Sequence, residues 1–370
     1  MNAHATEHTP KRYFYTIWKG YTSMRRLNTL RGIISAEDVN LICPHEHLFI
    51  DMTHEAVEPK TEAEKKLFYS DICMNNLCAL RRNPYISYTN LILDDVDLAV
   101  EETKCLADVG CNLLVDVTTV GVGRDMMKLK AFSEKSDLNV IVGTGLFVHD
   151  ALPKMYEHRS AEQIAAWMID EIENGHCDTG IKPGVIGEIG ISEKIYPVEE
   201  KSIRAAAIAS VVTDLPIYLH TYPWNRVALN AVKMLLEDGV KTENICICHL
   251  DVTFDDEYLR QALDLGIYLE FDNLSKEFFF EPQEGAFAGG PFETDVARVH
   301  KLKELIAEGY ANQLLLANDL CLKGSLHKYG GPGYDHAFRN FVPMMRLYGI
   351  FEEDIHKLLY VNPKRFLFQV

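Results

Sequence analysis

The chain places two histidines, His45 and His47, two residues apart directly after a short apolar run at 41–44. Side chains two positions apart on a β-strand point to the same face, so both imidazoles would converge while Glu46 faces the other way. Two converging neutral imidazoles are typical ligands of a borderline divalent metal such as zinc. A lone His-x-His pair also arises by chance or in packing, so this interpretation needs further ligands elsewhere in the chain.

Four further apolar runs end in a residue that can bind a metal. The runs at 184–187, 216–219, 245–248 and 313–318 lead to Glu188, His220, His249 and Asp319. The first three are separated by 32 and 29 residues, about one strand-helix-strand unit each, and Asp319 follows about two units later. Polar residues at the carboxyl ends of successive parallel strands surround the mouth of a barrel. The pattern therefore predicts one shared site.

Four imidazoles and two carboxylates are too many for one tetrahedral zinc and suit two divalent metals. Zinc is the first choice, with Mn²⁺, Co²⁺ or Ni²⁺ as alternatives. A water shared by two metals is acidified enough to be hydroxide near neutral pH. We predict Glu188 and Asp319 as catalytic carboxylates, with Asp319 orienting the hydroxide and carrying its proton to the leaving group. Asp251, Thr221 and Asp272 are candidate partners behind the ligands, although strand-end capping explains each of them equally well.

The elements that must position these residues alternate between buried strands and helices. Helical patterns fill the gaps; one begins at the capping box of Ser160 and Gln163 and ends at Gly175. We therefore predict an α/β fold, a (β/α)₈ TIM barrel with a binuclear metal centre at the C-terminal face of its strands. Short apolar runs predict the strands at 40–45, 112–117, 139–143, 184–188, 215–219, 244–248, 267–271 and 313–317.

Composition limits the class of protein. The 370 residues are 47% hydrophobic and 25% charged, which is ordinary for a globular chain. We predict an N-terminal extension at 1–27 and a single barrel domain at 28–370. A formal charge of −17 argues against a nucleic-acid or anionic-membrane partner. No apolar run approaches the roughly 18 residues that span a bilayer. Nine scattered cysteines predict free thiols and a cytoplasmic location.

Two connections, 48–95 and 272–295, are longer than simple turns, and long loops at the catalytic face often build the substrate pocket. Phe278 in the second is predicted to line the pocket or clamp its loop to the barrel rim. Lys323, four residues after Asp319, is our candidate for holding an anionic group of the substrate, although a solvated lysine is the commoner case. His149, Tyr222 and Trp224 follow strand ends and are further candidates for substrate contact.

Several motifs together resemble the phosphotriesterase family of the amidohydrolase superfamily, and most closely its phosphotriesterase-related branch. The resemblance implies a barrel with a binuclear, usually zinc, centre and a homodimer. It implies that His45, His47 and Asp319 hold the more buried metal, and that His220 and His249 hold the more exposed one. Many members bridge their metals with a carboxylated lysine, but the matching position here is Glu188. The motifs are His45-Glu46-His47, 110–125, Gly187-Glu188-Ile189-Gly190, Leu219-His220-Thr221, Cys248-His249-Leu250-Asp251, Ala317-Asn318-Asp319, 328–334 and Asn362-Pro363.

The predicted activity is hydrolysis, by attack of the metal-bridging hydroxide on the C=O group of a lactone, ester or amide of a small anionic metabolite. The phosphotriesterase-related resemblance favours lactones or N-acyl amino acid or N-acyl taurine amides, with phosphotriesters as promiscuous substrates. The alternatives are an organophosphate phosphotriesterase and a metal-containing binding protein without catalysis, and Asp319 as a proton carrier favours an enzyme. A single-metal, deaminase-like site is disfavoured because Glu188, His220 and His249 are all present.

Overall fold

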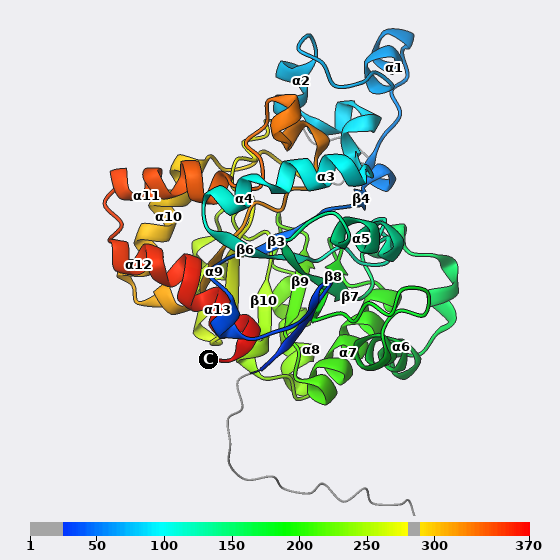
Figure 1. The fold of residues 1–370 in the computed structure, drawn as a ribbon, viewed down its shortest axis with the longest axis vertical. Helices are drawn as coiled ribbons and strands as arrows, with labels where there is room; N and C mark the ends of the chain where they lie inside the picture. Colours follow the sequence, from blue (N-terminus) through cyan, green and yellow to red (C-terminus); the bar gives the residue numbers. More distant parts are fainter. Residues whose placement is uncertain (1–24, 280–288) are drawn as a thin grey trace, which may run out of the picture.

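The computed structural model describes residues 25–279 and 289–370. Eight strands form one parallel sheet in which each strand pairs with the next along the chain. Helices cover the outside of this sheet (Figure 1), so the predicted (β/α)₈ barrel is confirmed. The strands are β3 (Leu41–Glu46), β6 (Cys111–Asp116), β7 (Asn139–Thr144), β8 (Val185–Ile191), β9 (Ile217–Thr221), β10 (Ile245–Ile247), β11 (Tyr268–Phe271) and β12 (Leu314–Leu316).

The first and last barrel strands meet at a seam that a side chain closes. The backbone N–H of Asp319, just after β12, donates to the carbonyl of His45 at 3.2 Å. Glu46 lies on the opposite face of β3 from His45. Its carboxylate accepts hydrogen bonds from the backbone N–H of Asn318 (3.1 Å) and of Leu320 (2.9 Å), and from Asn318 Nδ2 (2.8 Å). Glu46 therefore fixes the chain around Asp319 against β3.

The helices begin and end at local signals that the sequence carries. In α6, Ser160 Oγ accepts from the N–H of Gln163, the Gln163 side chain accepts from the N–H of Ser160, and Gly175 ends the helix, as predicted. The helices are α1 (Glu62–Phe68), α2 (Leu77–Arg82), α3 (Val96–Thr103), α4 (Cys105–Asp108), α5 (Met126–Ser133), α6 (Ala161–Asn174), α7 (Pro197–Thr213), α8 (Ala228–Glu237), α9 (Asp256–Asp264), α10 (Asp295–Ala307), α11 (Val342–Leu347), α12 (Glu352–His356) and α13 (Asn362–Phe368).

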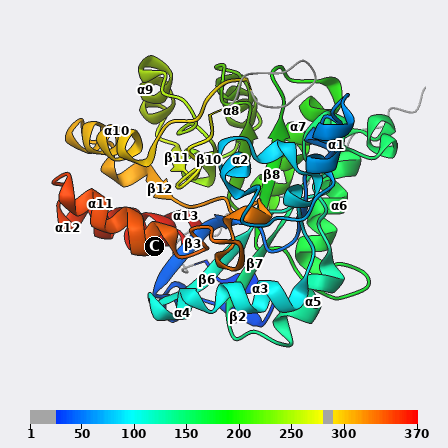
Figure 2. The same ribbon diagram turned by 90° about the horizontal axis from the view of Figure 1, so that it is seen from above.

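The two ends of the barrel carry different additions. The hairpin of β1 (Leu27–Thr29) and β2 (Gly32–Ile34) reaches the barrel through the N–H of Leu30, which donates to the carbonyl of Val140. The long connection after β3 starts and ends in a second antiparallel pair, β4 (Ile50–Asp51) with β5 (Ile92–Leu93), and carries α1 and α2 between them. In Figure 2 this excursion lies over the ends of the barrel strands. The predicted domain boundary at 27/28 stays a prediction, and residues 1–24 of the extension lie outside the described residues.

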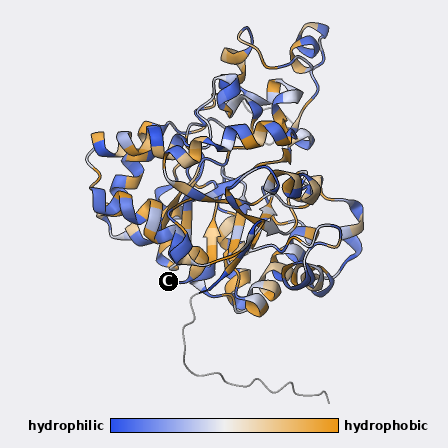
Figure 3. Cartoon of the chain, in the orientation of Figure 1, coloured by the Kyte–Doolittle hydropathy of each residue, from blue (hydrophilic) through white to orange (hydrophobic). Residues whose placement is uncertain are grey.

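The barrel interior and the layer between strands and helices form the core. Every residue of β8, β9, β10, β11 and β12 is buried. Figure 3 shows apolar colour on the central strands and mixed colour on the surrounding helices. Strands buried on both faces are rich in apolar residues throughout, which is why short apolar runs predicted them well. Their carboxyl ends are where polar residues begin.

Candidate metal centre

Glu188, on β8, lies at the centre of a buried cluster. The carboxyl ends of five strands, β3, β8, β9, β10 and β12, supply its side chains. Its Oε1 lies 3.3 Å from His45 Nε2, 3.3 Å from His220 Nδ1 and 3.0 Å from His249 Nε2. Its Oε2 lies 3.7 Å from His47 Nε2. Burial opposes ionisation of Glu188, but the surrounding imidazoles lower its pKa well below the usual range. Glu188 thus lies within 3.7 Å of all four histidines, and its role as a bridge between metals stays a prediction.

Asp319 completes the cluster from the last strand. Its Oδ1 lies 3.0 Å from His47 Nε2 and 3.7 Å from His45 Nε2. Its other oxygen accepts a hydrogen bond from the buried ammonium of Lys276. Burial alone would raise the pKa of Asp319, but Lys276 and His47 hold it below the usual range. Asp319 and His249 both adopt left-handed backbone conformations (φ 44° and 67°), which are uncommon for non-glycine residues.

Three of the histidines are hydrogen-bonded through Nδ1, the ring nitrogen that faces away from the cluster. His45 Nδ1 lies 2.8 Å from Glu270 Oε2, His47 Nδ1 lies 2.8 Å from Thr118 Oγ1, and His249 Nδ1 lies 3.1 Å from Asp272 Oδ1. A ring that donates through Nδ1 presents the lone pair of Nε2 to the cluster, as metal-ligating histidines do.

The donor set fits divalent metals. His45 Nε2 is fully buried and has no hydrogen-bond partner among the described residues, although it faces the cluster. The ligand atoms of His45, His47 and Asp319 all lie within 4.8 Å of one another, as do those of His45, Glu188 and His249. Imidazole nitrogens and carboxylate oxygens at this spacing are the donors that zinc and similar metals use. The two donor sets share His45, and both the number of metals and the assignment of each ligand stay predictions.

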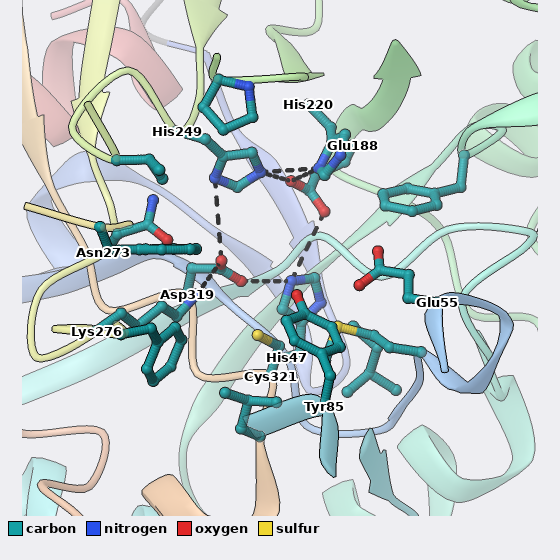
Figure 4. A pocket seen from close by; sticks show the side chains of 18 residues that line it. His47, Glu55, Tyr85, Glu188, His220, His249, Asn273, Lys276, Asp319 and Cys321 are labelled. Atoms are coloured by element: carbon teal, nitrogen blue, oxygen red, sulfur yellow. Dashed lines mark hydrogen bonds and ion pairs between the residues drawn. The ribbon is translucent and has the colours of Figure 1, made fainter. Parts of the chain in front are cut away.

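A pocket opens directly over this cluster (Figure 4). One side is formed by Asn273 and Lys276 from the loop after β11, and the other by Glu55 and Tyr85 from the excursion after β3. Apolar side chains complete the wall, namely Ile50, Met52, Phe147, Val252, Phe278, Phe292 and Leu322. A small organic molecule would therefore meet an apolar wall with few polar contacts, as is usual for ligand sites.

The structure places only Phe278 of the five predicted substrate residues on this pocket. Lys323 lines a separate small cavity with Asp94 and Asp95, because Cys321 and Leu322 line the pocket and the chain then turns away. His149 bonds Ser192 Oγ and stacks on Tyr196 with ring centroids 3.4 Å apart.

The two aromatic candidates after His220 form an outer layer. Tyr222 and Trp224 pack edge to face with centroids 5.2 Å apart, and Trp224 packs on Phe292, which does line the pocket. Both support the pocket wall from behind.

Of the candidate partners behind the ligands, Asp272 contacts a ligand directly and the other two do not. Thr221 donates to the carbonyl of Cys248 in the neighbouring strand. Asp251 accepts from the backbone and side-chain nitrogens of Asn273 (both 3.0 Å) and pairs with the fully buried Arg298 at 2.9 Å. Asp251 therefore fixes the loop that carries Lys276.

Sequence reasoning missed four residues at the site: Glu270, Thr118, Lys276 and Glu55. Glu270 had a usable signal, because it precedes Asp272 by two positions at the end of the same strand. Thr118 follows β6 in the same way. Lys276 and Glu55 lie in loops, where no periodic pattern indicates which side chains turn inward.

The described residues contain no helix with both the length and the apolar character needed to cross a membrane.

The family model of the phosphotriesterase family matches residues 25–367. A phosphotriesterase-related protein of Nematostella vectensis is 32% identical over 343 residues, covering 92% of this chain and 97% of the relative. An N-acetyltaurine hydrolase of Xenopus tropicalis is 32% identical with the same coverage. The crystal structure of a resiniferatoxin-binding protein from Rhodobacter sphaeroides is 31% identical, with a TM-score of 0.88 over 93% of this chain and 95% of that chain.

Proposed function

This chain belongs to the phosphotriesterase family and is a hydrolase, and from this premise we propose that it cleaves the amide bond of a small anionic N-acyl compound with two bound divalent metals. Zinc is the metal that best suits the donor set. The observation that carries the proposal is the Glu188 cluster, in which four imidazoles and two carboxylates converge at the floor of a pocket with largely apolar walls.

Four histidines and Asp319 would hold the two metals, with Glu188 shared between them. Bound there, divalent metals acidify a water and polarise the carbonyl that it attacks. The residues behind the ligands keep each imidazole in one tautomer and one orientation; for His45 and His249 these are Glu270 and Asp272.

Asp319 is the residue that we propose takes up the proton of the attacking water. It lies beside His47 and borders the pocket. Lys276 keeps Asp319 ionised and therefore able to accept a proton. The low basicity of the Asp319 carboxylate favours passing that proton on to the departing nitrogen. The water oxygen first forms the new C–O bond at the carbonyl carbon, and the C–N bond then breaks as the nitrogen receives the proton from Asp319, so a carboxylate and a free amine leave.

The substrate class follows from the pocket and from relatives. Several similar proteins are named N-acetyltaurine hydrolases, and taurine amides carry a sulfonate. Lys276 is the one Lys or Arg side chain among the described residues that lines the pocket. We propose that it attracts the anionic group of the substrate, in place of Lys323, which faces elsewhere. This combination favours N-acyl amides over lactones and phosphotriesters.

Metal analysis and a substrate panel test the proposal. Metal-replete protein should contain two divalent ions per chain, and a content of one or none would contradict the binuclear site. Of N-acetyltaurine, N-acetyl amino acids, lactones, aryl esters and a phosphotriester, the anionic amides should show the highest kcat/KM, and chelation should abolish it. If the protein binds such anions tightly and hydrolyses none of the panel, it is a binding protein.

A further inference from the structure

One carboxyl group in the pocket has no part in the mechanism above. Glu55 ends a short 3-10 helix (Thr53–Glu55) that follows β4, and it is only 8% exposed. The hydroxyl of Tyr85 is hydrogen-bonded to its carboxyl group, and His54 Nε2 lies 3.7 Å from its Oε1. Its Oε2 is buried and has no hydrogen-bond partner among the described residues. A buried oxygen without a partner costs about 1–3 kcal/mol, so its retention calls for an explanation.

The position of Glu55 supplies that explanation. Figure 4 shows its carboxyl group pointing into the pocket from the side opposite Asn273 and Lys276, with the Glu188 cluster between the two sides. The pocket is therefore bipolar, with a cation on one wall and a carboxyl group on the other. Burial raises the pKa of Glu55 to about 7, and Tyr85 limits that rise by stabilising the ionised form. A group that donates a hydrogen bond to Oε2 would relieve the penalty.

We propose that Glu55 recognises a hydrogen-bond donor, an ammonium or a hydroxyl group, on the acyl portion of the substrate. This inference rests on the proposed amide hydrolysis. When the anionic amine portion lies toward Lys276 and the carbonyl lies over the Glu188 cluster, the acyl portion extends toward Glu55. A plain acetyl group would leave Oε2 unpaired, whereas a hydroxyacyl or aminoacyl group would bind it. Sites built to pair a polar group discriminate strongly against ligands that lack the partner.

Three taurine amides test the inference on the metal-loaded enzyme: N-acetyltaurine without a donor, N-glycoloyltaurine with a hydroxyl group and N-glycyltaurine with an ammonium group. The wild type should show a kcat/KM at least tenfold higher for one of the donor-bearing amides than for N-acetyltaurine. Glu55→Met should lower that ratio at least tenfold. Glu55→Gln keeps an acceptor without the charge, so it should retain a preference for glycoloyl and lose one for glycyl.

A matched control lies three residues further along the chain. Glu58 is exposed, bonds Tyr69 and does not line the pocket, so Glu58→Gln should leave the ratio unchanged. Equal or better hydrolysis of N-acetyltaurine by the wild type would overturn the inference, as would an unchanged ratio in Glu55→Met. The ratio of kcat/KM values in the wild type can overturn the inference by itself, so the test remains valid even if a variant fails to fold. Hydrolysis without preference contradicts only the role of Glu55. Hydrolysis of none of the amides contradicts the proposed function, and the inference falls with it.

Discussion

Replacing Arg298 by Met should destabilise the folded protein strongly. The Arg298 side chain is fully buried and lies 2.9 Å from Asp251 Oδ2 and 3.0 Å from Asp295 Oδ1. Without its guanidinium, two buried carboxyl groups lose their compensating charge. Removing one partner of such a buried pair costs about 3–5 kcal/mol.

The expected fall in Tm follows from the size of the chain. An unfolding entropy of about 2.1 cal/mol/K per residue gives about 0.8 kcal/mol/K for 370 residues. The loss of Arg298 should therefore lower Tm by about 4–6 °C at pH 8. Arg260 is a matched control, because it pairs with Glu304 and Glu308 at the surface, and surface pairs contribute little. Arg260→Met should leave Tm nearly unchanged.

The deficit in stability of Arg298→Met relative to the wild type should depend on pH, and this dependence identifies its cause. Burial raises the pKa of Asp251 to about 6 in the native protein, and Arg298 opposes that rise. Removal of Arg298 should raise this pKa further. A carboxyl group with a raised folded-state pKa loses stability as pH rises from its unfolded toward its folded value. The deficit should thus grow from pH 6 to 8 and shrink toward pH 5, without vanishing, because Asp295 also loses its ion pair with Arg298 and keeps only its contacts with His336 and the backbone N–H of Ser275. Differential scanning fluorimetry across this range measures it. A deficit that matches Arg260→Met, or that grows toward acid pH, would refute this reasoning.

Three further changes test the site. Asp319→Asn can still offer one oxygen to a metal but cannot take up a proton, so kcat should fall by roughly 10²–10⁴ while metal content, measured by mass spectrometry, largely survives. Glu188→Ala should lose metal and activity without unfolding the barrel, and reconstitution of the wild type should be indifferent to bicarbonate; a strong requirement for bicarbonate would mean that the bridge is assigned wrongly. Glu55→Gln should raise the free energy of unfolding by at most about 3 kcal/mol at pH 8, and Tm with it, but should change both little at pH 5, because the buried wild-type carboxyl with a pKa of about 7 destabilises the folded chain as pH rises from about 4.5 to 7. An equal gain at both pH values would exclude titration of Glu55 as the cause.

The residues at the strand ends could be predicted because the pattern that marks them lies within a few consecutive residues of the sequence. Buried parallel strands are apolar throughout, so the first polar residue after each run marks the barrel mouth. His45, Glu188, His220, His249 and Asp319 were all found in this way, and the structure brings them together.

The pocket walls were not predictable, because they depend on how long loops fold back. Lys323 looked suitable from its distance along the chain to Asp319, but the backbone turns between Leu322 and Lys323 and points it into another cavity. Lys276 reaches Asp319 only because Arg298 and Asp251 hold its loop from below. Such contacts join segments whose spacing in the sequence carries no period.

The seam between β3 and β12 has a consequence for how the protein matures. The ligands predicted for the more buried metal come from both edges of the seam, His45 and His47 from the first barrel strand and Asp319 from the last. A nascent chain in which β12 has not yet been synthesised lacks Asp319 and cannot assemble this donor set. Its Glu46 carboxylate also lacks the backbone N–H groups of Asn318 and Leu320, from which it accepts hydrogen bonds in the complete barrel. We therefore predict that metal capture at this position is coupled to the final closure of the barrel, so that a chain truncated before β12 cannot retain an ion there.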